Sequence, residues 1–327
     1  MKHPIPIRIL DGGLGTSLED KYGVKFSLHT PLWSSHLLLS DQKTLLECQT
    51  DFAEAGADIL LTATYQVSIS GFAATRTPEW PRGVSLPNIG QFLEDAVLIA
   101  ESAGRGGGGR GGSGGSGNGS TEIAISLGPY GATMVPSTEY TGAYDKDHIG
   151  TNKLAQWHFE RVMLYAKQQG LMSRVRYLAF ETIPRLDEVK AIRGVLASFK
   201  TPGWISCVFP GHDDNDRLPD GSTVEDVVTA ALACGGEMTT KRPPWGIGIN
   251  CTKIQKLSGL VKKFEKAVQG LIDLGDLHGW PSLVLYPDGT NGEVYNTTTK
   301  TWELPAGSTK PEVRTYLLTS IAPASTF

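Results

Sequence analysis

Two apolar segments on either side of a helical pattern, near the start of the chain, place the strongest constraint on its fold. Residues 5–10 alternate like a strand and run into a glycine-rich turn at residues 11–16. Ser40 is a plausible N-cap for a helix that Gly56 ends, and residues 59–65 follow as a second strand. The helical stripe consists of Leu45, Cys48, Phe52 and Ala55. Strand, helix and strand joined by a tight connection predict a parallel sheet.

The same alternation continues along the chain. Further strands are predicted at residues 122–127, 177–184, 204–209, 246–251 and 282–286, and further helices at residues 152–169, 187–199, 224–232 and 257–268. Seven strands in alternation with helices favour an α/β fold, a (β/α)₈ TIM-type barrel that is incomplete at the eighth strand. A doubly wound open sheet is the alternative. The barrel is favoured because polar residues follow many strands, whereas an open sheet concentrates its site at one switch point.

We expect one barrel domain over residues 1–327, with two irregular segments. Residues 104–120 are almost entirely Gly, Ser and Arg, a composition that predicts a disordered surface insertion. A domain linker is the competing interpretation, but the alternation of strand and helix resumes directly after the segment. Residues 305–327 form an atypical tail, in which only residues 316–321 could supply an eighth strand.

The net charge and the cysteine content indicate which classes of partner and which cellular compartment to expect. The net charge is −4 and the basic residues are scattered, so a nucleic-acid partner is not expected. The first ten residues hold no long apolar run, so we expect neither a secretory signal nor a membrane span and predict a cytoplasmic protein. Four cysteines without close paired spacing are expected to be free thiols or metal ligands. They are Cys48, Cys207, Cys234 and Cys251.

Carboxylates end two of the predicted strands. Asp11 follows the first strand and Glu181 lies at the end of the fourth. Strand ends converge in a barrel, so the two carboxylates could hold a substrate ammonium group or act as acid and base. The alternative is that Asp11 caps its own turn and Glu181 pairs with an arginine. The residues alone leave both interpretations open.

Other candidate residues carry weaker signals. Gly12, Gly13 and Gly15 lack the pattern of a P-loop or a dinucleotide site and more simply let the chain turn closely beneath a ligand. Cys251 ends the sixth strand and is either an available ligand or a buried apolar cysteine. His158 and Arg161, one helical turn apart, are interpreted as a solvated or helix-packing pair. The absence of His-x-x-His, Cys-x-x-Cys and Gly-x-Ser-x-Gly excludes the commonest zinc-finger and hydrolase patterns.

Five sequence blocks at or beside predicted strand ends carry a family resemblance. They are Asp-Gly-Gly-Leu-Gly-Thr at 11–16, Gly-Ala-Asp-Ile at 56–59 with Thr-Ala-Thr-Tyr-Gln at 62–66, Ser-Leu-Gly-Pro-Tyr-Gly-Ala at 126–132, Phe-Glu-Thr-Ile-Pro at 180–184 and Gly-Ile-Asn-Cys-Thr at 248–252. Together they resemble the homocysteine S-methyltransferases that use S-methylmethionine or S-adenosylmethionine. The resemblance extends from about residue 7 to about residue 304, interrupted by the glycine-rich segment.

The resemblance implies a barrel that binds homocysteine and one Zn²⁺ at the carboxyl ends of its strands. Zinc would lower the pKa of the homocysteine thiol, and the thiolate would attack the methyl group of a sulfonium donor to give methionine. Carried over by motif, Asp11 and Glu181 would hold the homocysteine amino group and Cys251 would be the first zinc ligand. The residues implied to line the pocket are Gly12, Thr64 and Tyr65.

The sequence departs from the family at the remaining zinc ligands. The family supplies the second and third thiolates from a Gly-Gly-Cys-Cys motif, and this sequence contains none. Cys234 precedes the sixth strand, at the opposite end, while Cys207 lies within a strand and could point inward. Two hypotheses follow: an active methyltransferase, or a homocysteine-binding barrel that is catalytically impaired or inactive. A Schiff-base lyase is disfavoured because no predicted strand ends in lysine, and no motif selects the methyl donor.

Overall fold

Six parallel strands form one sheet in a computed structural model that describes residues 7–27, 30–106, 121–211, 215–235, 242–288, 294–296 and 301–303. Their spatial order follows the chain order from β1 to β6. Leu10 extends the sheet by a parallel bridge to Ile59 in β1. The strands are β1 (Ile59–Leu61), β2 (Glu122–Leu127), β3 (Tyr177–Ile183), β4 (Gly203–Cys207), β5 (Gly246–Lys253) and β6 (Ser282–Asp288).

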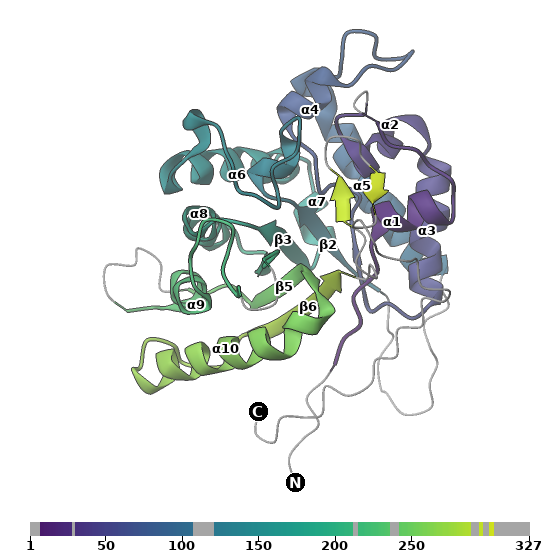
Figure 1. The fold of residues 1–327 in the computed structure, drawn as a ribbon. Helices are drawn as coiled ribbons and strands as arrows, with labels where there is room; N and C mark the ends of the chain where they lie inside the picture. Colours follow the sequence, from purple (N-terminus) through teal and green to yellow (C-terminus); the bar gives the residue numbers. More distant parts are fainter. Residues whose placement is uncertain are drawn as a thin grey trace.

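Helices cover the outside of this sheet in the order in which they occur in the chain (Figure 1). α3 packs on α5, α5 on α6, α6 on α8, α8 on α9 and α9 on α10. These helices are α3 (Gln42–Glu54), α5 (Leu86–Gly106), α6 (Thr151–Ala166), α8 (Leu186–Ala197), α9 (Val224–Leu232) and α10 (Ile254–Asp273). Shorter helical segments are α1 (Leu14–Asp20), η1 (Trp33–His36), α2 (Leu37–Ser40), α4 (Ile69–Ala74), η2 (Tyr130–Thr133), η3 (Lys146–His148) and α7 (Leu171–Arg174).

Successive side chains of each strand enter two different cores. The inner core contains Ile59, Ala124, Tyr177, Ala179 and Trp204, whereas Ile205 and Cys207 pack with the helices. Both faces of the sheet are therefore apolar, as expected for parallel strands covered by helices. The consecutive strand order is that of a TIM-type barrel, so the predicted α/β barrel class is confirmed. The doubly wound alternative is wrong, because it requires the strand order to reverse at a switch point.

Most predicted elements are found close to their predicted positions, with four corrections. Of the first predicted strand, residues 7–10 are described, and within them only Leu10 pairs with the sheet, by a bridge. Asp41, not Ser40, caps α3, because its side chain accepts the Thr44 N–H. Helix α5 was not predicted, although its buried residues recur at helical spacing. It ends at Gly106, so the first three residues of the predicted insertion at 104–120 are helical instead.

The end of the described chain adds a feature that the sequence did not predict. β7 (Val294–Asn296) and β8 (Thr301–Glu303) form an antiparallel hairpin, with Val294 opposite Glu303. Residues 107–120 and the tail from 305, with the candidate eighth strand at 316–321, lie outside the described residues. Closure of the barrel and the single-domain assignment therefore stay predictions. Among the described helices, none combines the length and apolarity that crossing a bilayer requires.

Candidate active site

Two irregular strand ends shape the carboxyl edge of the sheet. Thr182 near the end of β3 and Cys251 near the end of β5 both have left-handed backbone, with φ of 60° and 47°. The strand register shifts at each position, as in a β-bulge. The side chain of Asn250 joins the two ends: its Oδ1 accepts the Thr182 N–H at 2.7 Å, and its Nδ2 donates to Thr182 Oγ1 at 2.7 Å. The bulges are therefore locked to one another.

The sulfur of Cys251 lies within a ring of hydrogen-bond donors. Asn250 Nδ2 is 3.3 Å away and Thr182 Oγ1 is 3.6 Å away, and the Tyr140 hydroxyl also donates to Cys251 Sγ. Burial raises the pKa of the Cys251 thiol to about 12, and the charge of Glu139 adds to this shift. In the absence of a cation, Cys251 is thus a neutral thiol at pH 7.

Asp11 follows the Leu10 bridge and turns its carboxylate toward the sheet edge. Its Oδ2 accepts the Leu61 N–H at 2.7 Å. Its Oδ1 is buried and has no hydrogen-bond partner among the described residues. Burial raises the pKa of Asp11 well above its usual range, and the nearby Glu181 carboxyl raises it further. A buried acceptor without a partner is costly, so this oxygen is suited to a donor that a ligand supplies.

Glu181 lies in β3 and is only 6% exposed. Its Oε1 accepts the Ser126 hydroxyl at 2.6 Å, and its side chain also has a hydrogen bond with Tyr286. Burial raises the pKa of Glu181 to about 7. Asp11 and Glu181 are close enough to interact electrostatically, as the sequence predicted. The ordinary alternatives describe them in part: Asp11 bonds across to β1, and Glu181 is hydrogen-bonded to hydroxyl groups while the charge of the buried Arg161 acts on it and lowers its pKa.

The remaining predicted pocket residues lie at the same edge with different exposure. Thr64 is fully buried and its hydroxyl donates to the Ser126 carbonyl at 2.9 Å. The Tyr65 hydroxyl donates to Glu139 Oε2 at 2.6 Å. Gly12 is exposed, and a Cβ there would lie 2.7 Å from the Phe52 ring, which requires the ring to move. Glycine at this position therefore allows close packing of the turn on α3.

Arg161 on α6 bonds to the loops that follow β1 and β2. It is 2% exposed, and its guanidinium donates to the carbonyl of Gly128 at 2.6 Å, to that of Thr64 at 3.1 Å and to that of Tyr65. Burial lowers the pKa of Arg161 to about 10, which leaves it charged at pH 7. The predicted solvated alternative for the His158–Arg161 pair is wrong. The helix-packing alternative is closer, although Arg161 bonds to loop carbonyls at the site.

His158 forms a second buried connection. Its Nε2 lies 2.8 Å from Glu188 Oε1, and both side chains are fully buried. Glu188 also accepts the Tyr130 N–H at 2.8 Å and the Tyr144 hydroxyl at 2.5 Å. Burial lowers the pKa of His158, so the ring is neutral and donates through Nε2. Glu188 on α8 is thus hydrogen-bonded both to His158 on α6 and to the loop after β2.

Sequence reasoning missed Ser126, Glu139, Tyr140, Thr182, Asn250 and Tyr286 as site residues. Thr182 and Asn250 stand beside residues that were selected, and the signature blocks include both. Glu139 and Tyr140 lie in an irregular loop with no periodic pattern, and only the fold brings them to Cys251. No local signal in the sequence would have identified these two.

The described residues do not complete a zinc site around Cys251. No group of three or more His, Cys, Asp or Glu side chains suited to a metal occurs among them. Cys207 packs in the helix-facing core, so the expectation that it could point inward is wrong. Cys234 bonds to the Leu232 carbonyl after α9 and precedes β5, at the opposite end of the sheet. A catalytic zinc takes three protein ligands, of which Cys251 would supply one.

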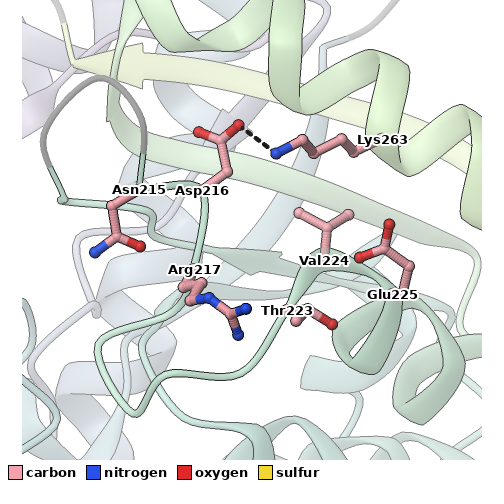
Figure 2. A pocket seen from close by; sticks show the side chains of 7 residues that line it. All are labelled: Asn215, Asp216, Arg217, Thr223, Val224, Glu225 and Lys263. Atoms are coloured by element: carbon pink, nitrogen blue, oxygen red, sulfur yellow. Dashed lines mark ion pairs between the residues drawn. The ribbon is translucent and has the colours of Figure 1, made fainter.

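A separate surface hollow of about 260 Å³ lies between the loop after β4, the start of α9 and α10 (Figure 2). Within it, Lys263 Nζ pairs with Asp216 Oδ2 at 2.9 Å. Lys256 Nζ lies 3.6 Å from the other oxygen of Asp216 and donates to three loop carbonyls. Lys256, Lys263 and Asp216 therefore have charged or polar partners within the protein. None of the predicted site residues lines this hollow, so we place no chemistry there.

Comparison with known proteins identifies the family. The sequence profile of the family described as Homocysteine S-methyltransferase matches residues 8–316. The chain belongs to the homocysteine S-methyltransferase family. It is 31% identical to Homocysteine S-methyltransferase YbgG of Bacillus subtilis, over 91% of this chain and 81% of that protein. It is 30% identical to Homocysteine S-methyltransferase 2 of Arabidopsis thaliana, over 90% of this chain and 79% of that protein.

The fold of a solved family member is also similar. The metallated form of the homocysteine methyltransferase MmuM from Escherichia coli superimposes with a TM-score of 0.64 at 26% identity, over 86% of this chain and 83% of that one. The name of that structure records a bound metal in MmuM. The resemblance inferred from the five sequence blocks is thereby confirmed at the level of the family and the barrel-type fold.

Proposed function

We propose that this protein transfers a methyl group from a sulfonium donor, S-methylmethionine or S-adenosylmethionine, to the thiol of homocysteine, giving methionine. The sulfur of homocysteine attacks the methyl carbon, and the bond from that carbon to the donor sulfur breaks. Its electron pair stays on the donor sulfur, which becomes a neutral thioether, and the homocysteine thiol loses its proton to solvent. The sulfonium charge already activates the methyl group, so positioning supplies much of the catalysis.

The observation that carries this proposal is the unsatisfied Oδ1 of Asp11 beside Glu181. Two buried carboxyl groups with raised pKa values match an amino-acid ammonium group, which would donate to both and stabilise their charged forms. Thr64 and Tyr65 would line the same pocket, with Gly12 at its rim. Family membership makes homocysteine the amino acid of choice.

Under this proposal, the reacting sulfur of homocysteine would lie beside Cys251. We propose that it is one ligand of a zinc ion. When bound, such a zinc would lower the pKa of the homocysteine thiol. The described residues do not complete that site, so the steps assigned to this chain are binding the ammonium group, orienting the substrate and excluding water.

A methyl-transfer assay tests the proposal. The purified chain is given homocysteine with S-methylmethionine or with S-adenosylmethionine, and methionine is measured; the ratio of kcat/KM values identifies the donor. Asp11→Asn should raise KM for homocysteine about tenfold or more, since it removes a charged partner of the ammonium group. Glu54→Gln, on the exposed side of α3, is the matched control. Full activity of Asp11→Asn would contradict the assignment of the ammonium site.

A second candidate function is a barrel that binds homocysteine without turnover. Among the described residues, Cys251 belongs to no group of three or more side chains suited to a metal, and this favours the second candidate. Zinc content separates the two functions. Near-stoichiometric zinc that is lost in Cys251→Ala, together with methionine formation, supports the methyltransferase. The second candidate is supported if the protein contains no zinc, binds homocysteine in a calorimetric titration and forms no methionine.

We also propose that the protein works in the cytosol. All four cysteines are free thiols, as a reducing compartment maintains them. Fractionation of the native host cell, with blotting for the chain, tests this.

A further inference from the structure

Gln49 on α3 is a buried polar residue that the proposed ammonium site does not include. Its side chain is only 1% exposed, and its Nε2 donates to the Leu61 carbonyl at 2.7 Å. Its Oε1 is buried and has no hydrogen-bond partner among the described residues. A buried amide oxygen without a donor is costly, so Gln49 Oε1 is suited to an N–H or O–H group that a ligand supplies.

The backbone of β1 shows where this oxygen lies. On one edge of the strand, the Ile59 N–H donates to the Ile9 carbonyl at 3.2 Å, and the Ile59 carbonyl accepts the Asp11 N–H at 3.0 Å. Leu61 is two residues further along, so its N–H and carbonyl point to the same edge. Their partners are side chains: the Asp11 carboxylate accepts the N–H at 2.7 Å, and the Gln49 amide donates to the carbonyl. Both side chains therefore lie at one place, where the backbone pairing on this edge ends.

Asp11 Oδ1 and Gln49 Oε1 are thus two buried acceptors attached to the same residue of β1, and both are without a partner among the described residues. Two acceptors can be satisfied together only by a group that brings an N–H or O–H to each. An ammonium group has three N–H donors and no acceptor, so it fits this pair. The phenyl ring of Phe52, three residues after Gln49 on α3, lies against Gly12 in the Asp11 turn. Helix α3 therefore supports both acceptors before a ligand binds, which reduces the ordering cost of binding.

We propose that Gln49 Oε1 and Asp11 Oδ1 accept hydrogen bonds from the same ammonium group of the bound amino acid. This inference rests on the proposed function, which makes that amino acid homocysteine. The carboxylate supplies the charge that attracts the ammonium group, and the amide oxygen adds a second fixed direction for its N–H bonds. The ammonium group takes no part in methyl transfer, so loss of Gln49 should raise KM for homocysteine and change kcat little.

Binding measurements with two thiols test the inference without requiring turnover. The probes are homocysteine and 4-mercaptobutanoic acid, which has the same thiol and carboxylate but no amino group. Calorimetric titration gives both dissociation constants. Gln49→Met removes the amide, and it should weaken homocysteine by about tenfold or more while leaving 4-mercaptobutanoic acid within about twofold. Gln42→Met, at an exposed position of the same helix, is the matched control and should leave both constants unchanged.

A second variant separates the acceptor oxygen from the hydrogen bond to Leu61. Gln49→Glu keeps an acceptor oxygen and loses the N–H that donates to the Leu61 carbonyl. Its preference for homocysteine over 4-mercaptobutanoic acid should therefore equal or exceed that of wild type at pH 8. Thermal unfolding checks that each variant is folded. If Gln49→Met does not fold, Gln49→Glu decides alone, and a loss of its preference for homocysteine overturns the inference.

The other outcomes also overturn the inference or separate it from the proposed function. Equal weakening of both thiols by Gln49→Met would mean that Gln49 only supports the Asp11 turn, which overturns the inference and leaves the proposed function untouched. A wild type that binds both thiols equally would also overturn it, and the methyl-transfer assay then decides the proposed function separately. A preference for homocysteine that depends on Gln49, without methionine formation, would sink the proposed function and leave the inference standing.

Discussion

Thr182 and Cys251 lie at the bulged ends of two strands that are not neighbours in the sheet, and Thr182 Oγ1 is 3.6 Å from Cys251 Sγ. Both residues have left-handed backbone, which is uncommon for residues other than glycine and strained for a β-branched one. Asn250 satisfies the Thr182 N–H that the bulge frees. The hydrogen bonds between the two bulges thus hold the Cys251 sulfur in one position at the carboxyl edge of the sheet.

The strain at Cys251 predicts an unusual order of stability among its variants. Cys251→Gly should be more stable than Cys251→Ala by roughly 1 kcal/mol, because glycine adopts a φ of 47° without a Cβ clash. Both variants lose the thiol, so the comparison isolates the backbone. Urea unfolding of the two proteins measures the difference, and an alanine variant at least as stable as the glycine variant would argue against backbone strain.

The raised pKa of Glu181 predicts a dependence of stability on pH. Between the ordinary value of 4.5 and the folded value of about 7, the folded state binds more protons than the unfolded state. The free energy of unfolding therefore falls as pH rises through this window and levels off above it. Glu181→Gln removes this contribution and should be more stable than wild type at pH 8 by roughly 2–3 kcal/mol.

The same substitution should weaken homocysteine binding, since the ammonium group loses one carboxylate. Unfolding of both proteins in urea at pH 5 and pH 8, with calorimetric titration of homocysteine, tests the two effects together. The difference between wild type and variant cancels the titrating groups that do not interact with Glu181, and the coupled Asp11 carboxyl contributes to it together with Glu181. A difference that does not change with pH would show that Glu181 keeps an ordinary pKa.

Arg161 predicts a contrast between two substitutions. Arg161→Lys keeps the charge but cannot reach three carbonyls in the same planar arrangement, so it should lose roughly 1.5–3 kcal/mol of stability. Arg161→Met removes every donor and should lose more. Homocysteine KM should rise in both variants, because the carbonyls of Thr64 and Tyr65 belong to the proposed pocket wall. A lysine variant with wild-type stability and KM would mean that charge alone matters here.

Glu188 accepts three buried donors, and this predicts the effect of an isosteric change. A glutamine at this position has one acceptor oxygen and presents an NH₂ group, so at least one of Tyr130 N–H, Tyr144 O–H and His158 Nε2–H loses its partner. Glu188→Gln should therefore cost roughly 1–3 kcal/mol. Glu160→Gln on the exposed side of α6 should change stability by less than about 0.5 kcal/mol. Equal stability of the two variants would contradict the three-donor arrangement.

The positions of strands, helices and three site residues could be predicted from local sequence patterns combined with the geometry of a parallel barrel. Apolar alternation located the strands, and helical stripes located α3, α6, α8, α9 and α10, because both periods follow from backbone geometry alone. Helix α5 has an equally regular stripe and was overlooked. Asp11, Glu181 and Cys251 could be selected because parallel strands bring their carboxyl ends to one edge.

The burial of Arg161 and the places of Glu139 and Cys207 depend on contacts between residues far apart in the chain. The carbonyls that bind Arg161 lie 33, 96 and 97 residues away in the chain, so no local pattern distinguishes its burial from a solvated position. Glu139 is identified only because the fold brings its charge close enough to act on Cys251, and Cys207 is excluded only because its strand turns that side chain toward the helices. The barrel-type fold and the family could both be predicted from sequence patterns, because these patterns follow from local backbone geometry and from the signature blocks at strand ends. Tertiary structure alone decided which buried charges meet at the site, because their pairing depends on how the loops after different strands pack together.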